Sequence, residues 1–213
     1  MSEPVPAGGS LATVLEAIAA ALVDAREELN ELDGAAGDGD LGLTAGRAAE
    51  ALRDVAPTLA DLEPPAAARA IGMALARKAP STGGTLLAFA CLAAGKVEPA
   101  GLPPGLPTLA VLLEAARDEV AARGKVAIGD RTMLDALAPA VTAIRSVADA
   151  RGSVAEALAE AAVAADAGAA ATIEMAATTG RAGWLAERAR GHEDAGARLI
   201  AIVFAAAGRA AAG

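Results

Sequence analysis

Apolar residues recur along this chain at intervals of three and four residues, the spacing of one face of a helix. The clearest case is the stretch from Ser10 to Glu31, whose first turn Ser10 can cap. Its apolar stripe consists of Leu11, Val14, Leu15, Ile18 and Leu22. No alternating strand pattern of useful length and no internal repeat occurs, so the pattern predicts an all-α protein.

Seven further helices are predicted after the first one. They span about 41–56, 66–79, 84–94, 108–122, 131–150, 153–175 and 194–212. Thr108, Asp130 and Ser153 are the expected N-caps of three of them, and Pro139 should kink or loosen the sixth. Short connections favour antiparallel neighbours, which predicts an up-and-down array of eight helices. At 213 residues we expect one domain, 10–213, after a flexible N-terminus, 1–9.

Glycines gather in the connections that follow the first, third, fifth and seventh predicted helices. These connections contain residues 34–42, 83–84, 124–129 and 180–196. Alternate loops of an up-and-down array lie on the same side, so all four should share one rim. The last of them, 176–193, is long for a compact domain, and such loops are often functional.

The composition narrows the functional classes. Apolar residues make up 54% of the chain but aromatic residues only 1%, and this reliance on Ala and Leu favours helices. A net charge of −9 argues against a nucleic-acid partner. The lone Cys91 allows no disulfide within the chain. Neither a basic signal-peptide region nor a clear membrane-spanning run is found, so we expect a soluble cytoplasmic protein without a membrane partner.

Three carboxylates, Asp33, Asp38 and Asp40, lie within eight residues on what the pattern predicts to be a tight loop. Because they repel one another, they call for a compensating cation, and oxygen ligands of this kind suit Mg²⁺. Mg²⁺ usually completes its shell with water and substrate phosphates. The segment Ser81–Thr85 opens a helix, so its amides and hydroxyls could hold a phosphate. Solvated turn chemistry and an ordinary Ser/Thr cap are the simpler alternatives.

Other known nucleotide and metal motifs do not fit. Residues 37–42 match GxGxxG, but no strand precedes them and two carboxylates would repel a pyrophosphate. An EF-hand counted from Asp38 has Leu43 instead of Gly and Ala49 instead of Glu. No P-loop occurs, and the single histidine, His192, argues against a Ser-His-Asp triad or a multi-histidine metal site.

Taken together, these segments resemble the DhaL family, the nucleotide-binding subunit or domain of dihydroxyacetone kinases. Its Asp…Gly-Asp-x-Asp-His-Gly signature is filled by Asp33, Asp38, Asp40 and Gly42. Its Gly-Asp-Lys-Thr-Met-x-Asp element appears as residues 129–135, with Arg131 in place of Lys. Its C-terminal signature appears as Gly180-Arg181-Ala182, Glu187-Arg188 and residues 191–197, with Ala195 in place of Pro. The resemblance covers nearly the whole chain.

The resemblance implies an antiparallel eight-helix barrel that binds ADP or ATP. It implies that Asp33, Asp38 and Asp40 hold two Mg²⁺ ions bridging the nucleotide phosphates. The other residues that it places around the nucleotide are Leu41, Gly42, Thr82, Gly83, Gly124, Met133, Arg181, Asp194 and Gly196. No catalytic group beyond the metal site is implied on this chain, because the acceptor would be held by a separate DhaK-type subunit.

One position departs from the family pattern: Leu41 stands where the family usually has His. Related fatty-acid kinase domains carry Thr there, so a lipid or fatty-acyl kinase domain is one alternative, and a non-catalytic nucleotide sensor is another. Within the leading interpretation, ATP could exchange freely, or bound ADP could be rephosphorylated by a DhaM-type phosphotransferase-system protein. The acceptor substrate, the partner's identity and whether the chain forms a homodimer stay open.

Overall fold

The computed structural model describes residues 10–98, 101, 103–176, 189 and 191–213. These residues form helices and connecting loops and contain no strand. The α-helices are α1 (Leu11–Asp24), α2 (Arg26–Ala36), α3 (Leu41–Val55), α4 (Pro64–Lys78), α5 (Thr82–Ala94), α6 (Leu106–Gly124), α7 (Met133–Asp149), α8 (Val154–Ala171) and α11 (Ala195–Ala212). Two 3₁₀ turns, η1 (Ala56–Thr58) and η2 (Thr172–Glu174), follow α3 and α8. The predicted flexible N-terminus, 1–9, lies outside the described residues.

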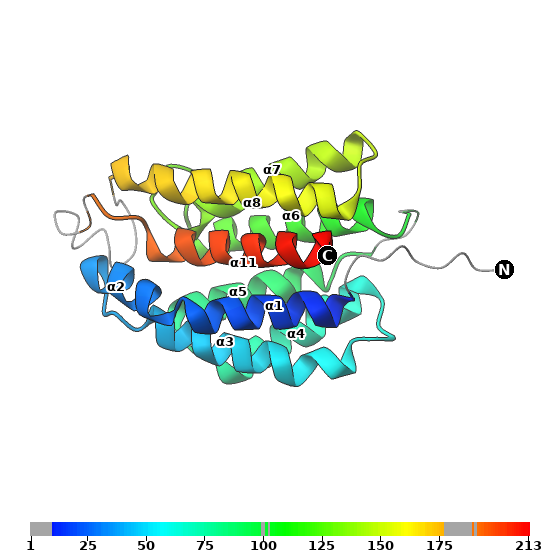
Figure 1. The fold of residues 1–213 in the computed structure, drawn as a ribbon, viewed down its shortest axis with the longest axis horizontal. Coiled ribbons are helices and arrows are strands. Elements are labelled where there is room, and N and C mark those ends of the chain that lie inside the picture. The colour runs from blue at the N-terminus through cyan, green and yellow to red at the C-terminus, as the bar shows by residue number, and fades with distance from the viewer. Residues whose placement is uncertain (1–9, 99–100, 102, 177–188, 190) are drawn as a thin grey trace.

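The helices close into a ring. Each of α1, α3, α4, α5, α6, α7, α8 and α11 contacts the next helix in this order, and α11 returns to α1 (Figure 1). The short helix α2 continues beyond α1 and packs on α3 at one end of the barrel (Figure 1). The predicted all-α, antiparallel, up-and-down barrel of eight helices is therefore confirmed, with α2 added at one end.

The barrel interior is built mainly from alanine and leucine side chains. Small residues let neighbouring helices approach closely, as at Gly168 of α8. A Cβ atom at this position would lie 2.3 Å from the carbonyl oxygen of Asp135 in α7. Close helix contacts bring many atoms together, so this alanine-rich core depends little on large aromatic side chains, of which Phe204 is one.

The first predicted helix differs in detail from the structure. It is interrupted at Ala25, and its second part, α2, continues to Ala36, beyond the predicted end at Glu31. Asp33 and Gly34 are therefore helical, and the predicted placement of Asp33 on a loop is wrong. The helix tolerates Gly34 and ends only before Gly37, whose φ of −143° and ψ of −146° are extended.

Two predicted helix caps are also wrong. The N-cap of α6 is Gly105, and Thr108 lies inside the first turn, where its hydroxyl donates to the carbonyl of Pro103. The N-cap of α7 is Thr132, because Asp130 turns back to accept the Ala127 amide. The predicted caps Ser10 and Ser153 are confirmed, and α7 continues through Pro139.

Among the described residues, one helix, α11, is long and apolar enough to cross a membrane by length and composition alone. However, 56% of that stretch is buried inside the protein. Its contacts with α8 and α1 close the barrel, so it is placed as a core helix.

Candidate functional site

A cavity of about 640 Å³ opens at the end of the barrel where α2 lies. Its walls come from four segments that are far apart in the sequence. They are the α2–α3 junction, the start of α5, the stretch from the end of α6 to the start of α7, and the start of α11. The structure thus brings the described parts of the four glycine-rich connections to one rim, as helix parity predicts.

The acidic wall of the cavity contains Asp33, Asp38 and Asp40. One carboxylate oxygen from each residue lies within 4.8 Å of the others. Asp33 is partly buried at the end of α2, whereas Asp38 and Asp40 are exposed. Carboxylates this close repel one another when all are ionised, so a bound cation would stabilise the arrangement.

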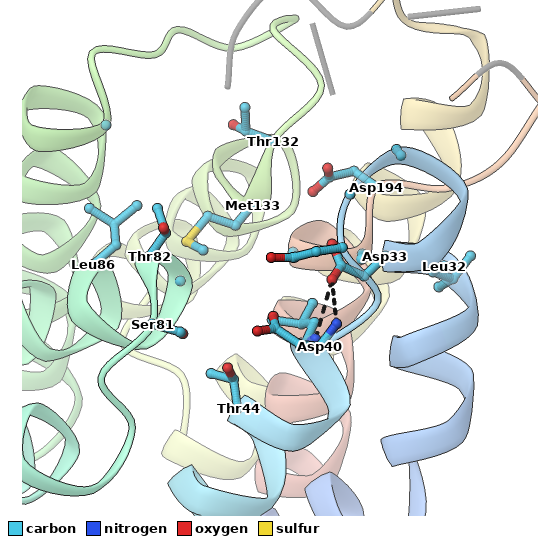
Figure 2. A pocket seen from close by; sticks show the side chains of 18 of the residues that line it. Leu32, Asp33, Asp40, Thr44, Ser81, Thr82, Leu86, Thr132, Met133 and Asp194 are labelled. Carbon is cyan, nitrogen blue, oxygen red and sulfur yellow. Dashed lines mark hydrogen bonds between the residues drawn. The ribbon is translucent and has the colours of Figure 1, made fainter. Parts of the chain in front are cut away.

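Asp33 also holds the start of α3 in place. Its Oδ2 accepts the amides of Asp40 at 2.9 Å and Leu41 at 3.3 Å (Figure 2). One turn earlier on α2, Oδ1 of Asn30 accepts the amide of Gly42 at 2.7 Å. Helix α3 has no side-chain cap from its own N-cap residue, so α2 supplies the acceptors that its first amides need. The same contacts fix the loop that carries Asp38 and Asp40.

The opposite wall is the N-terminus of α5, where Ser81 and Thr82 face the acidic side across the cavity (Figure 2). The Ser81 hydroxyl oxygen accepts the Gly84 amide at 3.0 Å. For the amides of Thr82 and Gly83, the described residues provide no acceptor. The helix dipole and these two donors make this wall suited to an anion.

The third wall is the start of α7, which has a complete capping box. The Thr132 hydroxyl accepts the Leu134 amide, and Oδ2 of Asp135 accepts the Thr132 amide at 2.7 Å. Oδ1 of Asp135 accepts the amide of Gly129 at 2.5 Å, which ties the preceding loop to the helix. This arrangement presents the Met133 side chain to the cavity (Figure 2).

Asp194 forms the fourth wall as the N-cap of α11. Its Oδ1 accepts the Ala197 amide at 2.8 Å, and its own amide donates to Oγ1 of Thr172. Burial raises the pKa of Asp194 to about 6, although the Ala197 hydrogen bond and the charge of Arg131 both lower it. The side chain still borders the cavity, so its protonation can respond to a charged ligand there.

Nearly all residues expected at the site line this cavity. They are Asp33, Asp38, Asp40, Leu41, Thr82, Gly83, Gly124, Met133, Asp194 and Gly196. Gly42 is buried behind them, with its amide bonded to Asn30, and the Leu41 amide is bonded to Asp33. A ligand contact by Leu41 would therefore involve its side chain. Arg181, Ala182, Glu187 and Arg188 lie outside the described residues.

Several residues of the cavity wall were not among the predicted metal and nucleotide contacts, although two of them, Arg131 and Thr132, lie within the 129–135 element. They include Thr44, Arg47, Leu86, Val126, Arg131 and Thr132. Thr44 and Arg47 lie one and two turns after Asp40, so helical spacing from the acidic loop could have identified them. Arg131 could not be identified in this way, because it lies before α7 with a left-handed φ of 62° instead of within the predicted helix.

The donor set fits a hard divalent cation. Two oxygens on opposite sides of one Mg²⁺ are roughly 4.2 Å apart, so a spread of 4.8 Å suits one ion after a small adjustment, or two ions that share these ligands. A phosphate placed between the acidic wall and the α5 N-terminus would meet cations on one side and backbone donors on the other. The arrangement can therefore hold a metal–phosphate group.

Comparisons with known proteins agree with this chemistry. A family model described as the DAK2 domain matches residues 35–209. The triokinase/FMN cyclase of Mus musculus is 35% identical over 210 residues, which cover 96% of this chain and 36% of that protein. The ADP-binding subunit DhaL of the PEP-dependent dihydroxyacetone kinase of Escherichia coli is 32% identical over 178 residues, covering 84% of this chain and 85% of the subunit.

A solved structure has the same architecture. The dihydroxyacetone kinase of C. freundii in complex with AMP-PNP and Mg²⁺ aligns with a TM-score of 0.75 and 28% identity. The alignment covers 98% of this chain and 36% of that chain. The chain thus spans about a third of the length of this kinase and of the mouse relative, and most of the length of the E. coli subunit.

Proposed function

Since the chain belongs to the DAK2 domain family, we propose that it is the nucleotide-binding subunit of a dihydroxyacetone kinase, or of a kinase acting on a related ketose. It would bind ADP or ATP with Mg²⁺ and present the nucleotide for phosphoryl transfer to a hydroxyl group. The observation that carries this proposal is the acidic triad, whose oxygens lie within 4.8 Å across a cavity from the α5 N-terminus.

The position of each residue on the cavity walls indicates which part of the metal–nucleotide complex it would bind. Asp33, Asp38 and Asp40 would hold the metal, and the amides of Thr82 and Gly83 would donate to phosphate oxygens. When bound, Mg²⁺ would neutralise charge on the transferring phosphoryl group and hold it in line with the acceptor. We propose two ions, because three carboxylates and a chain of phosphates offer ligands for both.

The remaining walls would hold the nucleoside. Met133 and Gly124 lie beside Leu86 and Val126, which gives an apolar face suited to an adenine ring. Asp194 and Gly196 border the same space from α11 and would approach the nucleotide from the other side. Leu41 lies near the α5 N-terminus, since a Cβ atom built on Gly83 would be 3.7 Å from its Cδ1. The Leu41 side chain would thus contact the nucleotide where the family usually has His.

The acceptor would be held by another subunit. No catalytic base on this chain is part of the proposal, and the E. coli relative is named as a subunit of a larger kinase. A separate DhaK-type protein, in the cytoplasm, would supply the ketose and position its hydroxyl group. If the nucleotide stays bound as ADP, a DhaM-type phosphotransferase-system protein would rephosphorylate it. The name of the E. coli relative contains the words PEP-dependent and ADP-binding.

Asp38→Ala tests the proposal directly. We expect the variant to bind ADP in Mg²⁺ at least tenfold more weakly than the wild type by calorimetry, since a metal ligand is lost. Its helical content should be unchanged, because Asp38 lies outside the helices. Asp61→Asn, which also removes one exposed negative charge but lies outside the cavity wall, is the matched control and should bind as the wild type does.

The outcomes separate the candidate functions. Equal affinity of wild type and Asp38→Ala would refute the metal assignment. Binding that depends on Asp38, followed by phosphorylation of dihydroxyacetone once a DhaK-type protein is added, would establish the kinase subunit. Tight ADP that neither exchanges with ATP nor supports turnover with any such partner would instead identify a nucleotide sensor.

A further inference from the structure

Arg131 is an unusual residue for the interior of this barrel. It is among the largest fully buried side chains, with 2% of its surface exposed, and it lies on the cavity wall directly before Thr132 and Met133. Its φ of 62° is in the left-handed region, which is unfavourable for a residue with a long side chain. Such a conformation persists only where the surrounding structure enforces it.

The guanidinium group joins backbone segments that are distant in sequence. Nε donates to the carbonyl oxygen of Thr172 at 3.2 Å, and Nη2 donates to the carbonyl oxygens of Ala189 and His192, both at 2.8 Å. Thr172 lies at the end of α8, and His192 is two residues before Asp194. The side chain therefore ties the start of α7 to the backbone that leads into α11.

Stability alone does not account for this arrangement. Among the described residues, no carboxylate lies within salt-bridge distance of Arg131, although its charge acts on Asp194, and Nη1 is buried without a hydrogen-bond acceptor. Burying a cation and leaving a donor unsatisfied are both costly, and a well-packed apolar side chain is often as stable in such a place. A functional role is the better explanation, because this costly residue lies between two walls of the cavity.

We propose that Arg131 is a positioning residue for the nucleotide site. By holding the carbonyl oxygens of Thr172, Ala189 and His192, it fixes the wall formed by Asp194 and Gly196 relative to Thr132 and Met133. Its role in affinity depends on the proposed function, whereas its role in ordering residues 191–197 does not. The family pattern has Lys at this position, but a single ammonium group lacks the planar fork of donors, so we expect lysine to replace Arg131 only in part.

The test compares Arg131→Met with Arg145→Met. Arg145, on α7, forms a bidentate ion pair with Glu114 at 2.7 and 2.8 Å and does not line the cavity. Its replacement therefore also removes an arginine and its hydrogen bonds, but away from the site. Calorimetry with ADP and Mg²⁺ measures affinity. Hydrogen exchange without nucleotide measures the amides of Asp194 and Ala197, which bond to Thr172 and to Asp194 respectively.

We expect Arg131→Met to bind ADP at least tenfold more weakly and to exchange these two amides at least tenfold faster than Arg145→Met. Arg131→Lys, which keeps the charge, should fall between wild type and Arg131→Met, and it carries the test if the methionine variant does not fold. Equal affinities and exchange rates in the Arg131 and Arg145 variants would overturn the proposal. If the wild type binds no ADP, the proposed function fails, and the exchange comparison alone decides whether Arg131 orders this wall.

Discussion

Helices α3 and α5 both begin at the same cavity, but their first amides have different partners. The first two amides of α3, those of Leu41 and Gly42, donate to Asp33 and Asn30 of α2. The corresponding amides of α5, those of Thr82 and Gly83, have no acceptor among the described residues. Every helix begins with amides that lack an intrahelical partner, so the difference lies in how each set is satisfied.

This difference suits one side of the site to a cation and the other side to an anion. On the α3 side, the amides are used to hold Asp33 and the acidic loop, which presents carboxylates to a cation. On the α5 side, the amides stay available to an anion, and the helix dipole adds to their attraction. A metal ion and a phosphate placed between the two sides would each meet the partner that it needs.

The glycines at the two helix ends reflect the same division. At Gly42, a Cβ atom would lie 2.0 Å from the carbonyl oxygen of Arg26, so protein packing alone requires glycine. At Gly83, a Cβ atom would touch only Leu41, at an ordinary 3.7 Å. Packing among the described residues does not require glycine there, whereas a closely approaching ligand would.

The largest expected effect comes from breaking the α3 side. Gly42→Ala should destabilise the protein by about 2–3 kcal/mol, because the new methyl group collides with backbone that cannot move aside easily. Urea denaturation measures this change. Gly46→Ala, on the same helix, is the control. Its Cβ would meet the flexible side chain of Arg26 at 3.1 Å, and its stability should stay within roughly 1 kcal/mol of wild type. Equal losses in both variants would contradict this account of Gly42.

A second pair of variants tests the α5 side. Gly83→Ala should leave the free energy of unfolding unchanged or slightly higher, yet weaken ADP binding in Mg²⁺ about tenfold, roughly 1.4 kcal/mol, by blocking the approach of phosphate. Gly84→Ala should instead lower the free energy of unfolding, because its Cβ would lie 2.1 Å from the carbonyl oxygen of Ala79. Calorimetry and urea denaturation separate the two effects. Wild-type affinity in Gly83→Ala would show that phosphate does not bind at this helix end.

The N-terminus of a third helix, α11, is capped by Asp194, whose protonation makes the stability of the protein depend on pH. Burial raises the pKa of Asp194 from 3.8 to about 6, so between these values the folded protein holds a proton that the unfolded chain releases. The contribution of Asp194 to stability therefore falls as pH rises from about 4 to about 6 and is constant above that range. Asp194→Asn keeps a capping oxygen but does not titrate. We expect its stability relative to wild type to rise by about 1 kcal/mol between pH 5 and pH 6 in urea titrations. Parallel pH profiles would refute the shifted pKa.

Much of the fold could be predicted from the sequence because helix formation depends on local spacing. Most of the apolar stripe of the first helix, the caps Ser10 and Ser153, and the all-α barrel are found in the structure, whereas Leu11 at the start of that stripe is exposed. Helix boundaries that depend on distant partners were predicted less well. Helix α2 continues to Ala36, and the Asp33 carboxylate near its end accepts amides from α3, a contact that local pattern does not reveal.

The site divides in the same way. The sequence itself determined which residues could carry the chemistry. The acidic triad and the Ser-Thr-Gly-Gly helix start are recognisable as residue types at short spacing, and Asp194 and Gly196 through the resemblance of residues 191–197 to the family signature. Only the tertiary structure decided that these segments share a cavity, that Asn30 and Asp33 use up the first amides of α3, and that Arg131 is buried in left-handed backbone. The physical reason is range. Helical periodicity and capping act over a few residues, whereas satisfying a buried amide or guanidinium depends on atoms that the closed barrel brings together from 41 to 61 positions away, as for Arg131.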